Sequence, residues 1–266
     1  MSAIRVPRTI AKMIEDNDND NLIITPLFSE FLASWDGNIS LKASEFVYEQ
    51  LQAKQRDRRY SWSASASGFC KRRQELAFLG LPQIGTSDPR MQHILYNGRW
   101  VHLRWQAELL TAGLIDMAES THIRKSLRAR CTMDGTGVSQ SGRFDGRDFG
   151  FELKGRNSFV YSQQGHLPDE KTRQQVDFEF LLTGMDLWVI INENKNDQKW
   201  HEWVFVRDES RMKIVLDELR ELNKAIDREK LHPLLPDCKK GKGEFLRCPF
   251  GGKGGSCLAS GTWPSL

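Results

Sequence analysis

Apolar and polar residues alternate strictly over residues 149–154, which is typical of a β-strand with one buried face. One face carries Phe149, Phe151 and Leu153, and the other carries Gly150, Glu152 and Lys154. An Asp145-Gly146 turn precedes this strand, so we expect residues 142–154 to form two short strands around that turn. The apolar face can bury itself, which leaves a carboxylate and an ammonium projecting together from the other face.

Segments with helical or strand periodicity surround this hairpin. Apolar spacing and end signals predict four helices, over residues 40–58, 100–114, 171–184 and 208–230. Short runs rich in β-branched and aromatic residues predict two paired strands, over residues 187–191 and 203–206. The fold class that this alternation predicts is α/β, with a central mixed sheet flanked by helices.

The composition fits a folded chain with a sizeable core. Of its 266 residues, 39% are hydrophobic and 27% are charged, which excludes a largely disordered protein. The chain has no apolar stretch suited to a signal peptide and no run of eighteen apolar residues, so we expect a cytoplasmic protein that does not enter the membrane. We divide it into a helical N-terminal extension, residues 1–58, and one domain over residues 59–266.

Asp145, Glu152 and Lys154 stand at a spacing that suits phosphodiester chemistry. If the turn brings Asp145 beside the strand, two carboxylates and a lysine converge on one point. Carboxylate oxygens are ligands that Mg²⁺ and Mn²⁺ prefer, and a nearby cation can act on the attacking water or the scissile phosphate. The alternative is a surface hairpin with a Glu/Lys pair, because Glu-x-Lys alone is a common tripeptide.

The order of these motifs is similar to that of a known nuclease superfamily. A helix with His102 comes first, then the Asp145 hairpin with its Glu152-x-Lys154 strand, and then a helix with Gln175. This order resembles the PD-(D/E)xK nucleases, and within them the RecB-like and lambda-exonuclease-like branch. The resemblance implies a restriction-endonuclease-like fold and metal-dependent, exonucleolytic hydrolysis of DNA.

The resemblance also implies which residues would bind a catalytic metal ion. Asp145 and Glu152 would ligate Mg²⁺ or Mn²⁺, the Leu153 carbonyl would complete the shell, and His102 would supply a nitrogen ligand. Lys154 would position the water or offset the charge that grows on the transferred phosphate. For His102 the alternative is a packed core histidine, since it lies on an apolar helix.

Gln175 would hold the lysine, the water or the terminal nucleotide in a protein of this family. Gln174 stays an alternative, because the family has an aromatic residue one turn after its glutamine. Phe178 has that spacing from Gln174, whereas Glu179 stands one turn after Gln175. We favour Gln175, since Gln175-Val176 is similar to the glutamine helix of phage-type exonucleases in this branch.

Four of the five cysteines indicate a metal centre. Cys70 precedes the nuclease motifs, and Cys238, Cys248 and Cys257 follow them within a Gly- and Lys-rich segment that cannot build a core. The set resembles the iron–sulfur staple of CRISPR-associated Fe–S exonucleases and AddB-type nuclease domains. That resemblance implies a 4Fe–4S cluster that ties a C-terminal loop to the Cys70 region. Zinc is the alternative, because four thiolates suit either metal, and Cys131 lies outside the pattern.

Charge is unevenly distributed although the net charge is only +3. Residues 54–73 hold seven Lys or Arg against one acidic residue, and residues 238–257 hold five against one. The cysteine staple would bring both runs to one side, so we predict a DNA-binding lobe that contacts phosphates and includes Arg72 and Arg73. The alternative for each run is a solvated face.

The sequence therefore predicts a Mg²⁺- or Mn²⁺-dependent DNA exonuclease that acts on linear or single-stranded ends in recombination, repair or degradation. The expected partners are DNA, and further copies of the chain or a recombination or CRISPR protein. The alternative is a non-catalytic module on the same fold, which binds DNA ends or serves CRISPR adaptation. Asp145, Glu152 and Lys154 occur together, which argues against a decayed site.

Overall fold

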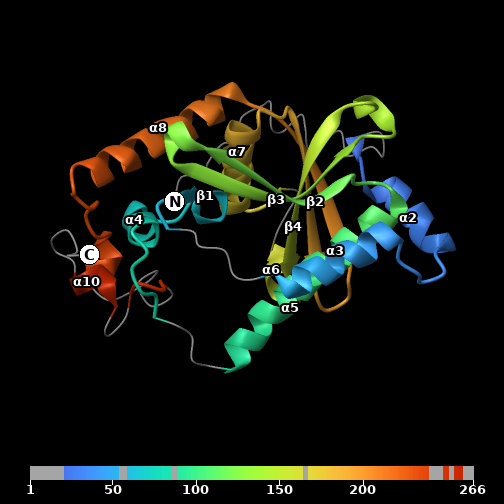
Figure 1. The fold of residues 1–266 in the computed structure, drawn as a ribbon, viewed down its shortest axis with the longest axis horizontal. Coiled ribbons are helices and arrows are strands. Elements are labelled where there is room, and N and C mark those ends of the chain that lie inside the picture. The colour runs from blue at the N-terminus through green and yellow to red at the C-terminus, as the bar shows by residue number, and fades with distance from the viewer. Residues whose placement is uncertain are drawn as a thin grey trace.

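A six-stranded mixed sheet with helices on both faces forms the body of the protein (Figure 1). The computed structural model describes residues 21–53, 59–84, 89–163, 167–239, 248–251 and 255–259. The predicted α/β class, with a central mixed sheet flanked by helices, is confirmed.

The strands are β1 (Trp62–Ser63), β2 (Met117–Arg124), β3 (Ala129–Val138), β4 (Asp148–Arg156), β5 (Leu187–Asn194) and β6 (Trp200–Val206). They lie in the order β1-β3-β4-β5-β6, and β2 also pairs with β3. β4 runs parallel to β5, whereas β3 with β4 and β5 with β6 are antiparallel. The predicted strand pair downstream of the glutamine helix is confirmed, and both strands are longer than their apolar runs.

The neighbours of β3 change along its length. On one side β2 pairs with it from Ala129 to Thr136. On the other side β1 pairs with Ala129 and Arg130, and β4 pairs only from Gly135 to Val138. Residues 131–134 therefore face a stretch where β4 has separated from β3, and the candidate site lies at this opening.

Helices cover both faces of the sheet. On one face lie α2 (Thr25–Ser34), α3 (Leu41–Gln52) and α5 (Pro89–Ala112), and on the other lie α4 (Lys71–Phe78), α7 (Glu170–Thr183) and α8 (Glu209–Asp227). Shorter helical segments are α6 (Ser158–Gln163), α9 (Pro236–Lys239), α10 (Ser256–Ala259), η2 (Ala64–Ala66), η3 (Lys125–Leu127) and η4 (Gly142–Phe144). None of the described helices is long and apolar enough to cross a membrane.

The four predicted helices all form, with some ends displaced. α7 ends where predicted, because Gly184 takes the left-handed conformation at φ 74 that glycine adopts without strain. α3 begins after Ser40, whose side chain accepts a hydrogen bond from the Ala43 N–H, but it ends at Gln52 rather than at residue 58. α5 begins at Pro89, before the predicted start at residue 100.

Alternation along β4 and β5 divides the buried apolar residues between two cores. Phe149, Phe151 and Leu153 pack on the face covered by α2, α3 and α5. Trp188 and Ile190 of β5 pack on the opposite face with α7 and α8. Gly150 permits this, since a Cβ there would come within 2.6 Å of the Trp188 ring. Both faces of the central strands are therefore buried, as a parallel pair requires.

A buried carboxylate on β6 attaches the N-terminal helices to the sheet. Glu202, 7% exposed, accepts hydrogen bonds from the N–H groups of Ile23, Ile24 and Thr25, at 2.6, 3.0 and 2.6 Å, where α2 begins. Trp200 adds an indole N–H bond of 3.1 Å to the Thr25 hydroxyl. These groups sit in the same core as α5, so the helices that precede residue 59 pack as part of the body.

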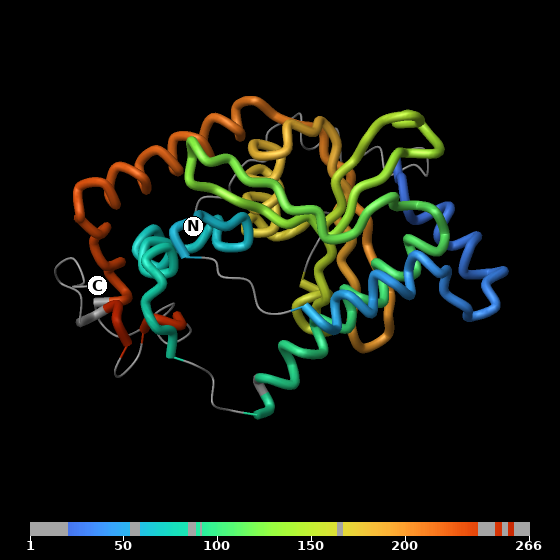
Figure 2. The backbone as a smooth tube through the Cα atoms, viewed as in Figure 1, coloured from blue at the N-terminus to red at the C-terminus, as the bar shows by residue number. Residues whose placement is uncertain are grey.

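The chain after α8 packs against α4 (Figure 2). The His232 imidazole lies between the fully buried Glu75 carboxylate and Glu221, with which its Nε2 forms a contact of 2.8 Å. Arg72 donates a hydrogen bond of 2.8 Å to the His232 carbonyl. Further along, Phe250 is buried against α4, and its carbonyl accepts from the Cys257 N–H.

Replacing Glu202 should detach α2 from the sheet. We expect Glu202→Ala to lower the free energy of unfolding by about 2–3 kcal/mol, because several buried N–H groups lose a charged acceptor. Chemical denaturation measures this change, and Glu30→Gln, an exposed site on α2, is the matched control. Equal stability of Glu202→Ala and the control would contradict this role for the carboxylate.

Candidate active site

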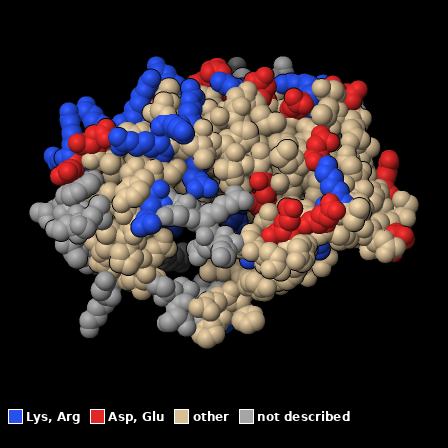
Figure 3. Space-filling model, viewed as in Figure 1, with Lys and Arg blue, Asp and Glu red and all other residues tan. Residues whose placement is uncertain are grey.

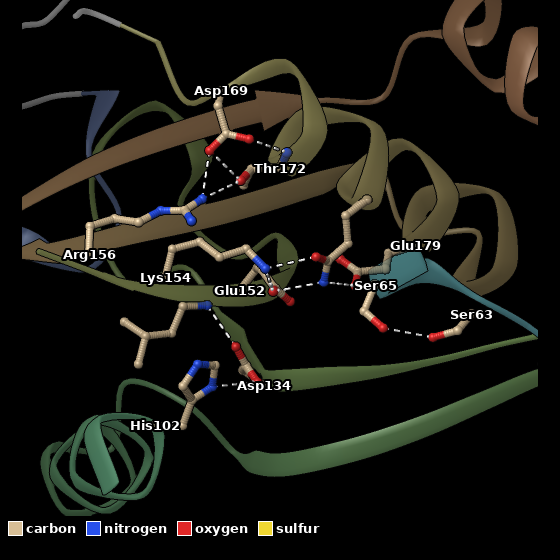
Figure 4. Close-up of polar contacts among 12 residues, drawn as sticks. Ser63, Ser65, His102, Asp134, Glu152, Lys154, Arg156, Asp169, Thr172 and Glu179 are labelled. Carbon is tan, nitrogen blue, oxygen red and sulfur yellow. Dashed lines mark hydrogen bonds and ion pairs between the residues drawn. The ribbon is translucent and has the colours of Figure 1, made fainter. Parts of the chain in front are cut away.

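An open cleft of about 620 Å³ lies where β4 separates from β3. α5 contributes His102, β3 contributes Asp134, and β4 contributes Glu152 and Lys154. Gln175 and Glu179 from α7 also line the cleft. Figure 4 shows Glu179 near Glu152 and Lys154. Four elements distant in sequence therefore bring imidazole, carboxylate, ammonium and amide groups into one cleft.

Glu152, Lys154 and Gln175 form a closed set of hydrogen bonds. The Lys154 ammonium lies 2.5 Å from Glu152 Oε1 and donates to Gln175 Oε1 at 2.7 Å. The Gln175 amide nitrogen donates to Glu152 Oε1 at 2.7 Å and to Glu179 Oε1 at 2.9 Å. Glu152 is 3% exposed. The Lys154 cation and the Gln175 amide therefore hold a buried carboxylate in one orientation.

Asp134 occupies the other side of the cleft and bridges two elements. Its Oδ2 accepts a hydrogen bond of 2.7 Å from the Leu153 N–H, and its Oδ1 lies 3.1 Å from His102 Nδ1. Glu152 is the next residue back from Leu153 on β4, and it lies on the cleft face. Asp134 and Glu152 therefore present two carboxylates to the same cleft, on neighbouring strands.

Burial and charge shift several pKa values in the cleft. Burial raises the pKa of Glu152, Lys154 opposes this shift, and the Asp134 charge adds to it. Burial alone would lower the pKa of Lys154, but the charge of Glu152 raises it overall. The pKa of His102 is raised in the same manner, because Asp134 outweighs the effect of burial. Glu152 is thus a carboxylate whose charge is only partly compensated, a condition that a divalent cation would relieve.

Asp145 does not take the predicted place beside Glu152. It follows the 3₁₀ turn η4 at the tip of the β3–β4 connection, and its side chain is exposed to solvent. Residues 142–144 form η4 and β4 begins only at Asp148, so the predicted short strand before the Asp145-Gly146 turn was also wrong. Asp148 is already about 14 Å along the strand from Glu152, at roughly 3.4 Å per residue, and Asp145 lies beyond it. Asp134 holds the position that the sequence led us to assign to Asp145.

The sequence contains a signal for Asp134 that the hairpin argument missed. Residues 129–138 alternate in burial over much of their length, with Ala129, Cys131 and Met133 buried on one face. An acidic residue inside such a strand is as informative as one in a turn, because it must have a partner. Asp134 finds two partners, and both come from segments more than fifteen residues away.

The other predicted site residues lie as follows. His102 faces the cleft rather than the core. The Leu153 side chain is buried, and its backbone N–H donates a hydrogen bond to Asp134. Gln175 lies within the cleft, whereas the Gln174 side chain packs against Gly68. This placement favours Gln175 over Gln174 as the glutamine that contacts Lys154.

Of the two predicted phosphate-binding residues, Arg72 is buried and Arg73 is half-buried, so the role of Arg73 stays a prediction. Arg72 is 6% exposed and donates to the His232 carbonyl, so the prediction that it contacts DNA was wrong. Arg73 lies over the Phe69 ring at 3.4 Å, and Lys171 contacts the same ring at 3.4 Å. Much of the two predicted basic runs, residues 54–58, 240–247 and 252–254, lies outside the described residues.

Cys248 and Cys257 pack in the same small core as Leu76 of α4, the helix that Cys70 caps. Burial raises the pKa of the Cys70 thiol, and the charges of Cys248, Cys238 and Cys257 raise it further. All five cysteines are free thiols, and Cys131 lies apart on β3, where burial raises its pKa. The predicted 4Fe–4S or zinc centre stays a prediction.

The described conformation contains no ready-made metal site. Among the residues described, no three His, Cys, Asp or Glu side chains are arranged to hold a metal ion. In the cleft the carboxylates already have partners. Lys154 contacts Glu152, and both His102 and the Leu153 N–H contact Asp134. The two carboxylates are nevertheless donors that suit Mg²⁺ or Mn²⁺.

No protein-family model matches the sequence, and no curated protein matches it. Solved structures are similar to this chain, among them three that share 14% sequence identity with it. LHK-Exo in complex with dAMP (TM-score 0.49) and the alkaline exonuclease LHK-Exo from Laribacter hongkongensis (TM-score 0.48) each cover 65% of this chain and 90% of their own. SSO0001 (TM-score 0.46) covers 84% of this chain and 96% of its own. These similarities are too low to carry a function over to this chain.

Manganese binding distinguishes Asp134 from Asp145. We expect Asp134→Asn to weaken Mn²⁺ binding at least about tenfold, because an amide lacks the charge of a carboxylate ligand. Isothermal titration calorimetry measures the affinity, and Asp145→Asn, at the exposed turn, should bind as the wild type does. Loss of affinity in Asp145→Asn but not in Asp134→Asn would overturn the placement.

Proposed function

We propose that the protein is a divalent-metal-dependent nuclease that hydrolyses DNA phosphodiester bonds and acts from DNA ends. The observation that carries this proposal is the meeting of Asp134, Glu152 and Lys154 in one open cleft. Two buried carboxylates on neighbouring strands offer hard oxygen ligands, and a fixed ammonium stands beside them. The motif order that resembles PD-(D/E)xK nucleases supports the same reaction class, with Asp134 in place of Asp145.

Asp134, Glu152, His102 and the Leu153 carbonyl would hold Mg²⁺ or Mn²⁺, which would polarise the phosphate and acidify a bound water. The chain supplies the remaining chemistry. Lys154, held by Gln175, places a positive charge beside Glu152, where it can offset the charge that develops on the phosphate. Buried carboxylates and backbone contacts keep these groups in position before substrate binds.

A second pocket beside the cleft supports action at DNA ends. This pocket, of about 510 Å³, shares Ser65, Lys154 and Gln175 with the catalytic cleft. It is also lined by Arg156, which pairs with Asp169 at 2.6 Å, and by Lys171. A cationic pocket next to the hydrolytic site suits the phosphate of a terminal nucleotide.

Exposed basic residues gather around η3 and the C-terminal half of α8 (Figure 3). A shallow pocket there is lined by Arg128, Arg220, Lys224 and Arg228, and by Asp227, which pairs with Arg128 at 2.7 Å. Arg128 directly precedes β3, and Arg130 on that strand lines the catalytic cleft, so the two regions are adjacent along the chain. We place the phosphate track of the DNA on this basic surface instead of on Arg72 and Arg73.

The basic surface should matter only for substrates long enough to reach it. We expect Lys224→Ser with Arg228→Ser to weaken binding of long DNA and to flatten its salt dependence by about one to two units. Cleavage of very short oligonucleotides should not change. Lys42→Ser with Lys199→Ser is the matched control, and an equal effect of both pairs in fluorescence anisotropy would contradict the placement.

We also propose that Cys70, Cys238, Cys248 and Cys257 hold one metal centre, a 4Fe–4S cluster or zinc. Their proximity at the junction of α4 and the C-terminal segment supports this, as does the thiolate preference of both metals. Such a centre would close a loop of more than a hundred residues and thereby reduce the entropy of the unfolded chain.

Metal analysis after anaerobic purification checks the cysteine centre. We expect iron or zinc in the wild type, a visible absorption band if the metal is an Fe–S cluster, and loss of both metal and thermal stability in Cys248→Ser. Cys131→Ser should keep the full metal content, since Cys131 lies on β3. Less than about half an equivalent of either metal in the wild type would rule out the centre.

Nucleotide release from end-labelled DNA tests the proposed function. With Mn²⁺, linear DNA should be degraded and chelation should stop the reaction, while covalently closed circular DNA should persist. Degradation of circles at the linear rate would change the proposal to an endonuclease on the same site. No hydrolysis of any DNA, despite bound Mn²⁺, would favour the non-catalytic end-binding alternative.

A further inference from the structure

Glu179 is a buried carboxylate in the cleft that the metal and phosphate roles leave unused. It lies on α7, one turn after Gln175, and is 0% exposed. Its Oε1 accepts a hydrogen bond of 2.9 Å from the Gln175 amide. Its Oε2 is buried without a hydrogen-bond partner in the described structure.

Packing alone does not explain a carboxylate at this position. An unsatisfied buried oxygen costs free energy, and an apolar or aromatic side chain would fill the same space without that cost. The neighbouring positions of α7 show this, since Val176, Phe178 and Phe180 all serve the core. A carboxylate at this position therefore lowers stability, which is expected of a residue that serves the site.

The hydrogen bonds of Gln175 show what Glu179 contributes. Both hydrogens of the Gln175 amide are used, one on Glu152 and one on Glu179, and its oxygen accepts from Lys154. An amide turned by 180° would present its oxygen to two carboxylates and its N–H groups to an ammonium. Two acceptors on one side therefore fix the amide orientation, and Glu179 is one of the two.

We propose that Glu179 is a positioning residue, which locks the Gln175 amide so that its oxygen holds Lys154 beside Glu152. This inference rests on the proposed nuclease function, because Lys154 is the group whose position matters. If Glu179 instead served only the fold, its removal would lower stability. If it were a metal ligand, replacing the carboxylate by an amide would weaken Mn²⁺ binding.

The test uses the full-length protein with Mn²⁺ and a short linear DNA substrate. The variants are Glu179→Leu, Glu179→Gln, Gln175→Leu and the double variant Glu179→Leu/Gln175→Leu. Leucine removes the hydrogen-bond acceptor, whereas glutamine keeps an acceptor oxygen without the charge. Glu108→Leu is the control, because Glu108 is also buried and helical but pairs with Arg104 outside the cleft.

We expect Glu179→Leu to lower kcat about 10- to 100-fold with little change in KM, as loss of an outer-shell partner does in metal sites. Its melting temperature should equal or exceed that of the wild type. Glu179→Gln should recover most of the lost rate and bind Mn²⁺ with wild-type affinity. The double variant should be no slower than Gln175→Leu, since both changes break one linkage. Glu108→Leu should lose stability and keep its rate.

Several results would overturn the inference. They are a wild-type kcat in Glu179→Leu, losses that multiply in the double variant, a fall in melting temperature that accounts for the lost rate, or weakened Mn²⁺ binding in Glu179→Gln. An inactive wild-type protein would instead refute the proposed function itself. The two failures are therefore distinguishable in one set of assays.

Discussion

The hydrogen bond from the Leu153 N–H to the Asp134 carboxylate is the contact on which the site depends. It forms where β4 leaves β3, so a side chain satisfies a backbone donor that the sheet no longer satisfies. The same bond fixes the carboxylate beside His102 and on the cleft face that carries Glu152. The separation of β4 from β3 thus both opens the cleft and places the Asp134 carboxylate in it.

Packing on the reverse of β4 makes this arrangement rigid. Phe151 and Leu153 are fully buried between the sheet and α5, so the alternate residues Glu152 and Lys154 cannot turn away from the cleft. α7 then contributes Gln175, whose amide links the ammonium and a carboxylate. Rigid elements position each polar group, as a pre-organised site requires.

Local patterns in the sequence predicted much of the strand and helix that carry the site. Period-two alternation places Glu152 and Lys154 on one face of a strand, whatever the tertiary structure. The same is true of α7, where Gly184 marks the helix end. Asp134 could not be found in this way, since its role depends on where two strands separate. A turn residue, Asp145, therefore seemed the nearer carboxylate, although it is exposed at the hairpin tip.

Arg72 shows that predictions made from runs of charged residues have the same limit. A run of basic residues predicts a phosphate-binding face, but burial of one member depends on a segment 160 residues later in the chain. The exposed basic surface formed instead around α8, from residues that no short run brings together.

The rate of Mn²⁺-dependent nucleotide release by Asp134→Ala, compared with the wild type and Asp145→Ala, tests the central claim most directly. If Asp134 and Glu152 form the hydrolytic centre, Asp134→Ala should lose activity by about a thousandfold or more while staying folded, and Asp145→Ala should keep most of it. Near wild-type hydrolysis by Asp134→Ala would contradict the account.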